Sequence, residues 1–195
     1  MKLNKLYIPN IFYFMEDIDE TILKNINKFK NIAIIYQNSI LELNKFLKIK
    51  KFCNKHKIKF FIIDNYKEAI KHKLDGIIIS HNNKRNLIIN NPICKKDNFL
   101  IFGKAHNQIE YFFKKQQFCK KIFLSPIFET KKYNESKILK IHKFNLISAN
   151  WLVDIYALGG INNKNYSSLK LTKSSGFGFS SFINEKVKIK KPTYF

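Results

Sequence analysis

Eight short apolar runs, each followed by a longer mixed segment, constrain the fold of this chain more than any other feature. Most of the runs are rich in Ile, Phe and Tyr, which favour strands. Most are apolar at consecutive positions, as expected for strands buried on both faces of a parallel sheet. The runs are Ile11–Phe14, Ile32–Tyr36, Lys59–Ile63, Gly76–Ile79, Phe99–Phe102, Lys121–Leu124, Asp154–Leu158 and Gly176–Phe179.

The segments between the runs predict helices, because neighbouring parallel strands need crossover connections. Asn107, followed three residues later by Glu110, resembles a capping box at the start of one of them. The segments Lys84–Ile89 and the one after Phe182 are poor helix formers. The predicted helices are Thr21–Phe29, Leu41–His56, Tyr66–Lys73, Asn107–Phe118 and Asn163–Leu169.

The alternation of strands and helices predicts an α/β fold with a parallel sheet. The chain has 195 residues and 45% hydrophobic content, enough for one domain with a core across residues 1–195. Eight strands favour a single (β/α)₈ TIM barrel over an open doubly wound sheet. Such barrels usually have about 250 residues and reach down to about 200, so short loops are expected.

The strongly basic balance admits two kinds of partner. Lys and Arg number 36 against 14 Asp and Glu, a formal net charge of +22, and a surface of this kind attracts polyanions. Nucleic-acid-binding proteins favour Arg, however, and Arg85 is the only Arg in the chain. A solvated Lys-rich surface is therefore favoured over nucleic-acid binding, and the charge also suits an anionic small-molecule substrate.

The expected cellular compartment and the role of the cysteines are inferred from features that the sequence lacks. It contains no uncharged apolar stretch of about 18 residues, so no membrane span is predicted. The first residues lack the apolar core and cleavage site of a secretion signal, so a cytoplasmic protein is expected. Cys53, Cys94 and Cys119 are widely spaced and indicate neither a disulfide framework nor a zinc site.

Polar residues follow the predicted strands at the end where a barrel of this kind forms its active site. His81 and His106 follow the fourth and fifth runs, and a structural role is favoured over a catalytic one for both. The other candidates at strand ends are Gln37, Asp64, Asn65, Thr130, Lys131, Lys132, Gly159, Gly160, Ser180 and Ser181.

The segment after the seventh run predicts a phosphate site. Gly159 and Gly160 let the backbone approach a ligand, and the Asn-rich segment that follows reads as the N-terminus of a helix. Ser180 and Ser181, after the eighth run, supply the second half of the site. Barrels often hold phosphate at these two loops. The alternative is a tight turn that binds no ligand.

Several segments, taken in order, resemble those of the thiamine-phosphate synthase/TenI family. No one motif is diagnostic, but their order and spacing are specific, and the likeness covers about residues 60–182. Asp64-Asn65 also lies where the family has an Asn-Asp pair. The segments are Asp75–Ser80, Ile101–Gly103, Pro126–Lys131 and Ala157–Ile161.

The resemblance implies a transferase of thiamine biosynthesis that joins a pyrimidine diphosphate to a thiazole phosphate. It also implies Mg²⁺, held by Asp64, with Thr130 and Lys131 or Lys132 as further catalytic residues. TenI relatives bind thiazole phosphate in the same barrel. The substrate- and phosphate-binding residues that the resemblance implies are Gln37, Asn65, Gly159, Gly160, Ser180 and Ser181.

The catalytic positions of the family are kept unevenly. Gln37 is all that remains of a Gln-x-Arg-x-Lys segment, and Asn83 occupies the place of a second metal-binding Asp. Ala105 stands where Ser is usual, and Pro126 replaces the catalytic His of the tautomerases. Two expectations follow: a thiamine-phosphate synthase with an incomplete catalytic set, or a TenI-like protein that binds thiazole phosphate without synthase activity.

Overall fold

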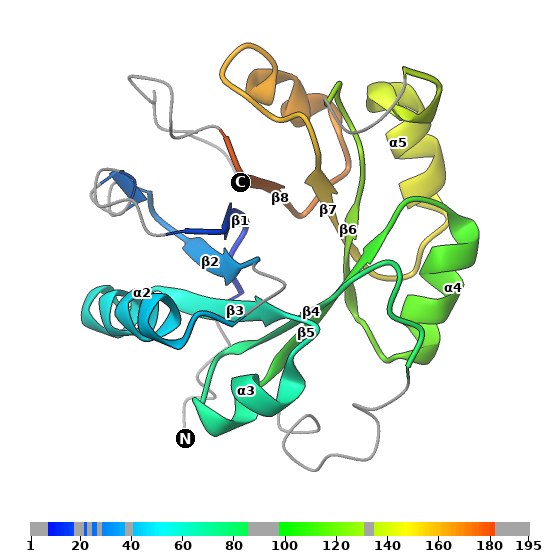
Figure 1. Cartoon of the computed structure of the whole chain (residues 1–195). Helices are drawn as coiled ribbons and strands as arrows, with labels where there is room; N and C mark the ends of the chain where they lie inside the picture. The colour runs from blue at the N-terminus through cyan, green and yellow to red at the C-terminus, as the bar shows by residue number, and fades with distance from the viewer. Residues whose placement is uncertain are drawn as a thin grey trace, which may run out of the picture.

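The computed structural model describes residues 8–17, 22, 25–26, 29–37, 41–85, 98–130 and 135–181. Its centre is a closed barrel of eight strands in sequence order, every neighbouring pair parallel (Figure 1). The predicted (β/α)₈ fold is therefore confirmed. The strands are β1 (Ile11–Met15), β2 (Ile32–Tyr36), β3 (Lys59–Ile63), β4 (Gly76–Ile79), β5 (Leu100–Ala105), β6 (Lys121–Leu124), β7 (Asp154–Leu158) and β8 (Gly176–Phe179).

Helices lie around the outside of the barrel (Figure 1). Asn107 caps α4 as predicted, because its Oδ1 accepts a hydrogen bond of 2.9 Å from the backbone N–H of Glu110. No described helix is long and apolar enough to cross a membrane. The helices are α2 (Leu43–His56), α3 (Tyr66–Lys71), α4 (Gln108–Gln116) and α5 (Lys140–Ala149), and the 3₁₀ turns are η2 (Glu135–Lys137) and η3 (Tyr166–Leu171).

Several predicted bounds differ from the structure by one or two residues, and two predicted elements differ by more. Strand β5 runs to Ala105, three residues beyond the predicted end at Phe102. The predicted helix Asn163–Leu169 is wrong, because a turn precedes the 3₁₀ helix η3 there. The predicted helix Thr21–Phe29 and the segment Lys84–Ile89 lie partly outside the described residues, and the segment after Phe182 lies wholly outside them.

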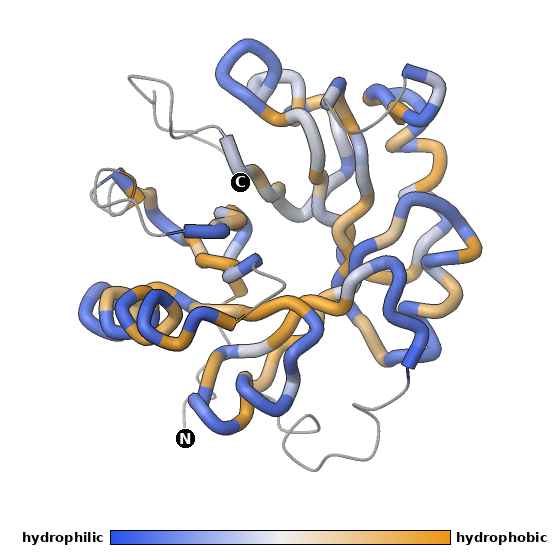
Figure 2. The backbone as a smooth tube through the Cα atoms, in the orientation of Figure 1, coloured by the Kyte–Doolittle hydropathy of each residue, from blue (hydrophilic) through white to orange (hydrophobic). Residues whose placement is uncertain are grey.

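The barrel interior is filled by aromatic side chains. The ring of Phe12 lies in edge contact with the rings of Phe61, Phe102, Phe123 and Tyr156, at centroid separations of 5.9, 5.0, 5.1 and 5.4 Å. Figure 2 shows the same distribution, with hydrophobic strands at the centre and hydrophilic segments outside. Because the centre is packed, a ligand site has to lie at a rim.

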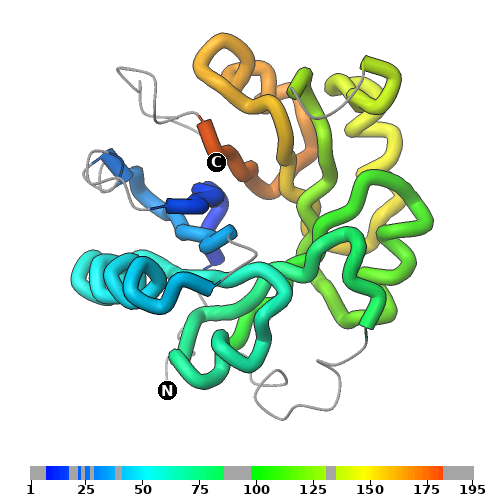
Figure 3. The backbone as a smooth tube through the Cα atoms, in the orientation of Figure 1, coloured from blue at the N-terminus to red at the C-terminus, as the bar shows by residue number. Residues whose placement is uncertain are grey.

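All the carboxyl ends of the strands lie on one rim, because the strands are parallel and each is followed by its own loop. Figure 3 traces this path from β1 to β8 around the barrel. The residues that follow the strands are therefore brought together although they are far apart in the sequence. This is the rim on which the candidate residues were predicted to gather.

Candidate functional site

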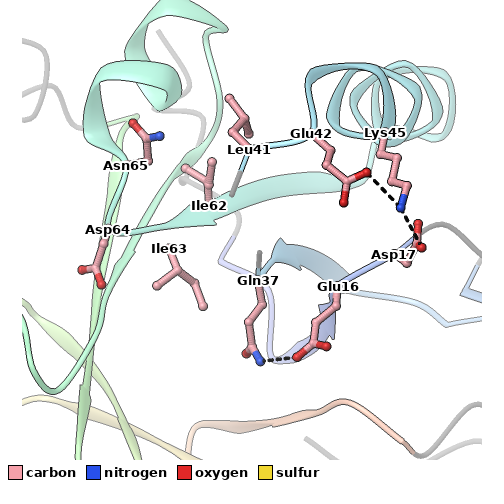
Figure 4. A pocket seen from close by; sticks show the side chains of 10 residues that line it. All are labelled: Glu16, Asp17, Gln37, Leu41, Glu42, Lys45, Ile62, Ile63, Asp64 and Asn65. Carbon is pink, nitrogen blue, oxygen red and sulfur yellow. Dashed lines mark hydrogen bonds and ion pairs between the residues drawn. The ribbon is translucent and has the colours of Figure 1, made fainter. Parts of the chain in front are cut away.

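Two cavities open at the carboxyl ends of the strands. The larger has a volume of about 890 Å³ and lies beside β1, β2 and β3 (Figure 4). The smaller, of about 90 Å³, lies beside β7 and β8, and Gln37 lines both. The larger is lined by Glu16, Asp17, Gln37, Leu41, Glu42, Lys45, Ile62, Ile63, Asp64 and Asn65. The smaller is lined by Phe14, Gln37, Lys104, Leu158, Gly159, Gly160, Ile161, Gly178, Phe179, Ser180 and Ser181.

Asp64 follows β3 directly, is exposed and lines the larger cavity. Its backbone is left-handed, with φ of 55°, a conformation that Asp and Asn adopt more readily than most residues. Its Oδ1 accepts hydrogen bonds from the Ser80 backbone N–H at 3.0 Å and from Asn83 Nδ2 at 2.8 Å. The position at which the resemblance implies a second Asp is thus occupied by Asn83, whose amide donates to Asp64.

Asn83 is held in place by two buried side chains, Lys114 of α4 and Gln117, the C-cap of that helix. Lys114 Nζ donates to the Asn83 carbonyl at 2.6 Å and to Gln117 Oε1 at 2.8 Å. Gln117 Nε2 donates to the carbonyls of Asn83 and Arg85, both at 2.9 Å. Burial lowers the pKa of Lys114. These bonds fix the loop after β4, and with it the amide that faces Asp64.

Two of the predicted binding residues already have partners in the structure. Asn65 lines the larger cavity, but its Oδ1 also caps α3 by accepting from the Glu68 backbone N–H at 3.2 Å. Gln37 Nε2 donates to Glu16 Oε1 at 3.1 Å, so Glu16 fixes the orientation of the side chain that lies between the two cavities (Figure 4).

The structure adds charged residues that sequence reasoning missed. Glu16 and Asp17 follow β1, and Lys45 lies in the first turn of α2. Lys45 Nζ lies 2.9 Å from Asp17 and 3.0 Å from Glu42, and these hydrogen bonds, Asp17 first, raise the pKa of Lys45. The sequence did contain an indication of them, because two acidic residues directly after the first strand lie at the active-site rim of a barrel.

The Gly159-Gly160 loop is shaped by the loop after β6. Both glycines have positive φ, 94° and 70°. The Phe128 backbone N–H donates to the Gly159 carbonyl at 3.1 Å, and a Cβ on Gly160 would overlap the backbone oxygen of Glu129. Asn165 Nδ2 donates to the Gly160 carbonyl at 2.8 Å. The loop is therefore a turn braced by side chains, not the start of an α-helix.

Replacing Gly160 with Ala should lower the free energy of unfolding by about 2–4 kcal/mol, because a left-handed backbone and a collision with the β6 loop both act against the side chain. The midpoint of urea unfolding measures it. Ser180→Ala, at an exposed position, should change stability by less than about 0.5 kcal/mol. Equal midpoints for Gly160→Ala and the parent would show that the two loops are not in this contact.

The remaining predicted residues fall into three groups. Thr130 ends the described part of the β6 loop, and its Oγ1 is buried with no hydrogen-bond partner among the described residues. Lys131 and Lys132 lie outside the described residues. The His81 and His106 rings meet edge to face at 4.4 Å, and His106 Nδ1 lies 2.8 Å from Glu110 Oε2. Burial lowers the pKa of His81.

The carboxylates at this rim fit Mg²⁺ only as an ion shared with substrate. Within the described part of the chain, no group of three or more His, Cys, Asp or Glu side chains could hold a metal. Mg²⁺ is commonly bound by one or two carboxylates together with substrate phosphate oxygens and water. Asp64 suits that arrangement, since both hydrogen bonds that its carboxylate accepts from described residues engage Oδ1.

Comparison with known proteins identifies a family by sequence, and solved structures share the fold. The family model described as thiamine monophosphate synthase (TMP-TENI) matches residues 37–183. The thiamine-phosphate synthase of Pelagibacter ubique (strain HTCC1062) is 29% identical over 209 residues, which cover 96% of each protein. The thiamine phosphate pyrophosphorylase of Pyrococcus furiosus has a TM-score of 0.71 at 14% identity, covering 90% of this chain and 87% of that one. The corresponding protein of Bacteroides thetaiotaomicron has a TM-score of 0.55 at 14% identity, covering 96% and 90%.

Proposed function

We propose that this chain, which belongs to the thiamine monophosphate synthase family, joins a pyrimidine diphosphate to a thiazole phosphate and releases diphosphate. The family membership rests on the model match across residues 37–183. The observation that carries the reaction is the pair of adjoining cavities at one rim, with Gln37 lining both. A reaction between two phosphorylated substrates needs two such places side by side.

The smaller cavity suits the phosphate of the thiazole. Gly159 and Gly160 let the backbone come close to a ligand, and Ser180 and Ser181 add hydroxyl and backbone donors on the facing strand end. The residues described as lining this cavity include no acidic side chain that would repel a bound anion. We therefore assign phosphate binding to these four residues.

The larger cavity suits the pyrimidine diphosphate. Asp64 would hold Mg²⁺ there, and the ion would supply positive charge to the departing diphosphate. In the reaction, the bond between the pyrimidine methylene and the diphosphate oxygen breaks, and its electron pair leaves with the diphosphate. The lone pair of the thiazole nitrogen then forms the new C–N bond. The protein's own task is to orient the two substrates and exclude water.

Residues of the β6 loop complete the proposed site. Thr130 Oγ1 is buried without a partner among the described residues, and we propose that it donates to a substrate oxygen. Lys131 and Lys132 follow it and are proposed as cations for the leaving group. The cytoplasm remains the compartment that we expect for this enzyme.

A coupling assay with both precursors tests the proposal, with thiamine phosphate separated by chromatography. We expect slow formation of product that requires Mg²⁺. A chain that forms no product but binds thiazole phosphate would instead be the TenI-like binding protein, which the Asp64–Asn83 hydrogen bond favours by occupying a carboxylate oxygen. A chain that does neither would contradict both accounts.

A further inference from the structure

Lys104 is a cation inside the barrel mouth. On β5, Leu100 and Phe102 belong to the cluster that fills the barrel interior, whereas Ala105 belongs to the outer layer beneath the helices. Side chains alternate between the two faces of a strand, so Lys104 has the same inward direction as Leu100 and Phe102. It is the last inward residue of β5 and lies at the carboxyl rim.

The contacts of Lys104 place its ammonium beside the Phe14 ring in the lining of the smaller cavity. Its Nζ lies 4.3 Å from the centroid of the Phe14 ring, a cation–π separation, and both residues line that cavity with Gly159, Gly160 and Ser180. An ammonium has three N–H donors, and contact with a ring face leaves it able to donate to a ligand oxygen as well. Lys104 is half-buried, which limits the water that competes for it.

The walls of the smaller cavity carry no acidic side chain among the described lining residues. A cation in a cavity lined by glycine backbone, hydroxyls and apolar rings has the surroundings of an anion site.

We propose that Lys104 binds a phosphoryl oxygen of the substrate that occupies the smaller cavity. The inference rests on the proposed function for the nature of the ligand, and on the strand register and the Phe14 contact for the residue. The Lys104 ammonium would contact the anion directly. The shared chemistry is a phosphoryl group, which either the thiazole phosphate or the diphosphate could present.

Calorimetric titration of the purified chain with inorganic phosphate and with pyrophosphate tests this, in EDTA so that no divalent ion bridges anion and protein. Lys104→Met should weaken binding of at least one anion about tenfold or more, because a hydrogen bond to a charged group is lost. Lys104→Arg should retain most of the affinity. Lys115→Met, which removes the same charge from an exposed position on α4, should bind like the parent.

The outcomes separate this inference from the proposed function. Weakening confined to phosphate would place Lys104 at the thiazole phosphate, and weakening confined to pyrophosphate would place it at the leaving group. A Lys104→Met chain that melts like the parent and binds both anions equally well would overturn the inference, even if coupling is observed. So would a parent that binds neither anion. Loss of binding in a chain without coupling activity would leave Lys104 as the anion residue of a different function.

Discussion

Replacing Asp64 with Asn is expected to lower the coupling rate by about 100-fold or more, the size of effect seen when a group that stabilises developing charge is removed. The substitution should change little besides the charge of the side chain. Asn tolerates the left-handed backbone at this position, with φ of 55°, and its carbonyl oxygen can accept the same bonds from Ser80 and Asn83. What is removed is the negative charge that the proposed site offers to Mg²⁺.

The measurement is the rate of thiamine phosphate formation at saturating precursors over a range of Mg²⁺ concentrations. Asp154→Asn is a matched control, because it removes the same charge from the start of β7 at the opposite rim, where Asp154 pairs with Lys121 at 3.3 Å. It should leave the rate within a few-fold of the parent. An Asp64→Asn variant that also stays within threefold would remove Asp64 from the reaction.

The strands were predictable from sequence because their burial is continuous. Six of the eight have the predicted bounds, and β2 and β7 illustrate why: each is apolar along nearly its whole length, on both faces. Strand β5 was predicted three residues short. Its last inward residue, Lys104, faces the cavity at the rim rather than the core. A charged residue at that point of the sequence favours the prediction of a loop.

Helices that bury few side chains were less predictable. No range was predicted for α5, in which Phe144 and Ser148 are the buried residues and Leu139 supplies no side-chain cap. The helix predicted after Gly160 failed for a different reason. Asn162 and Asn165 bond the backbone of their own turn, which is the local competition with helix formation that Asn is known for.

The placement of Asp64 and Asn83 at one rim could be predicted, but the hydrogen bonds that these residues form could not. Sequence order assigned Asp64 and Asn83 to the same rim, since both follow strands of one parallel sheet. The hydrogen bond between them, and the support of Asn83 by Lys114 and Gln117, depend on the packing of α4 against the loop after β4. A fully buried Lys is rare enough that a sequence pattern assigns it to the surface.

Replacing Asn83 with Asp should make the stability of the chain depend on Mg²⁺. Asn83 Nδ2 lies 2.8 Å from Asp64 Oδ1, so the substitution exchanges a donated hydrogen bond for two carboxylates in contact. Without a divalent ion the variant should lose about 1–3 kcal/mol of unfolding free energy, because like charges are held together and a hydrogen bond is lost. Lys114 and Gln117 hold the loop, so the new carboxylate cannot easily turn away.

Addition of Mg²⁺ should reverse this loss, since an ion that binds the folded state stabilises it by about 1.4 kcal/mol for each tenfold excess over its dissociation constant. Melting temperature against Mg²⁺ concentration gives the result without reference to activity. Asn82→Asp adds the same charge one residue away and should respond to Mg²⁺ as the parent does. An Asn83→Asp variant with the parent's response would show that the two side chains do not form a metal pair.

The coupling rate of the same variant decides between the two accounts of the family resemblance. If the chain is a synthase limited by a weak Mg²⁺ site, a second carboxylate beside Asp64 strengthens the site where diphosphate charge develops, and the rate should rise. If Asn83→Asp binds Mg²⁺ in the melting experiment yet forms no thiamine phosphate, the missing element is not the metal. The TenI-like role, binding thiazole phosphate at Gly159 and Gly160 without coupling it, then becomes the better account.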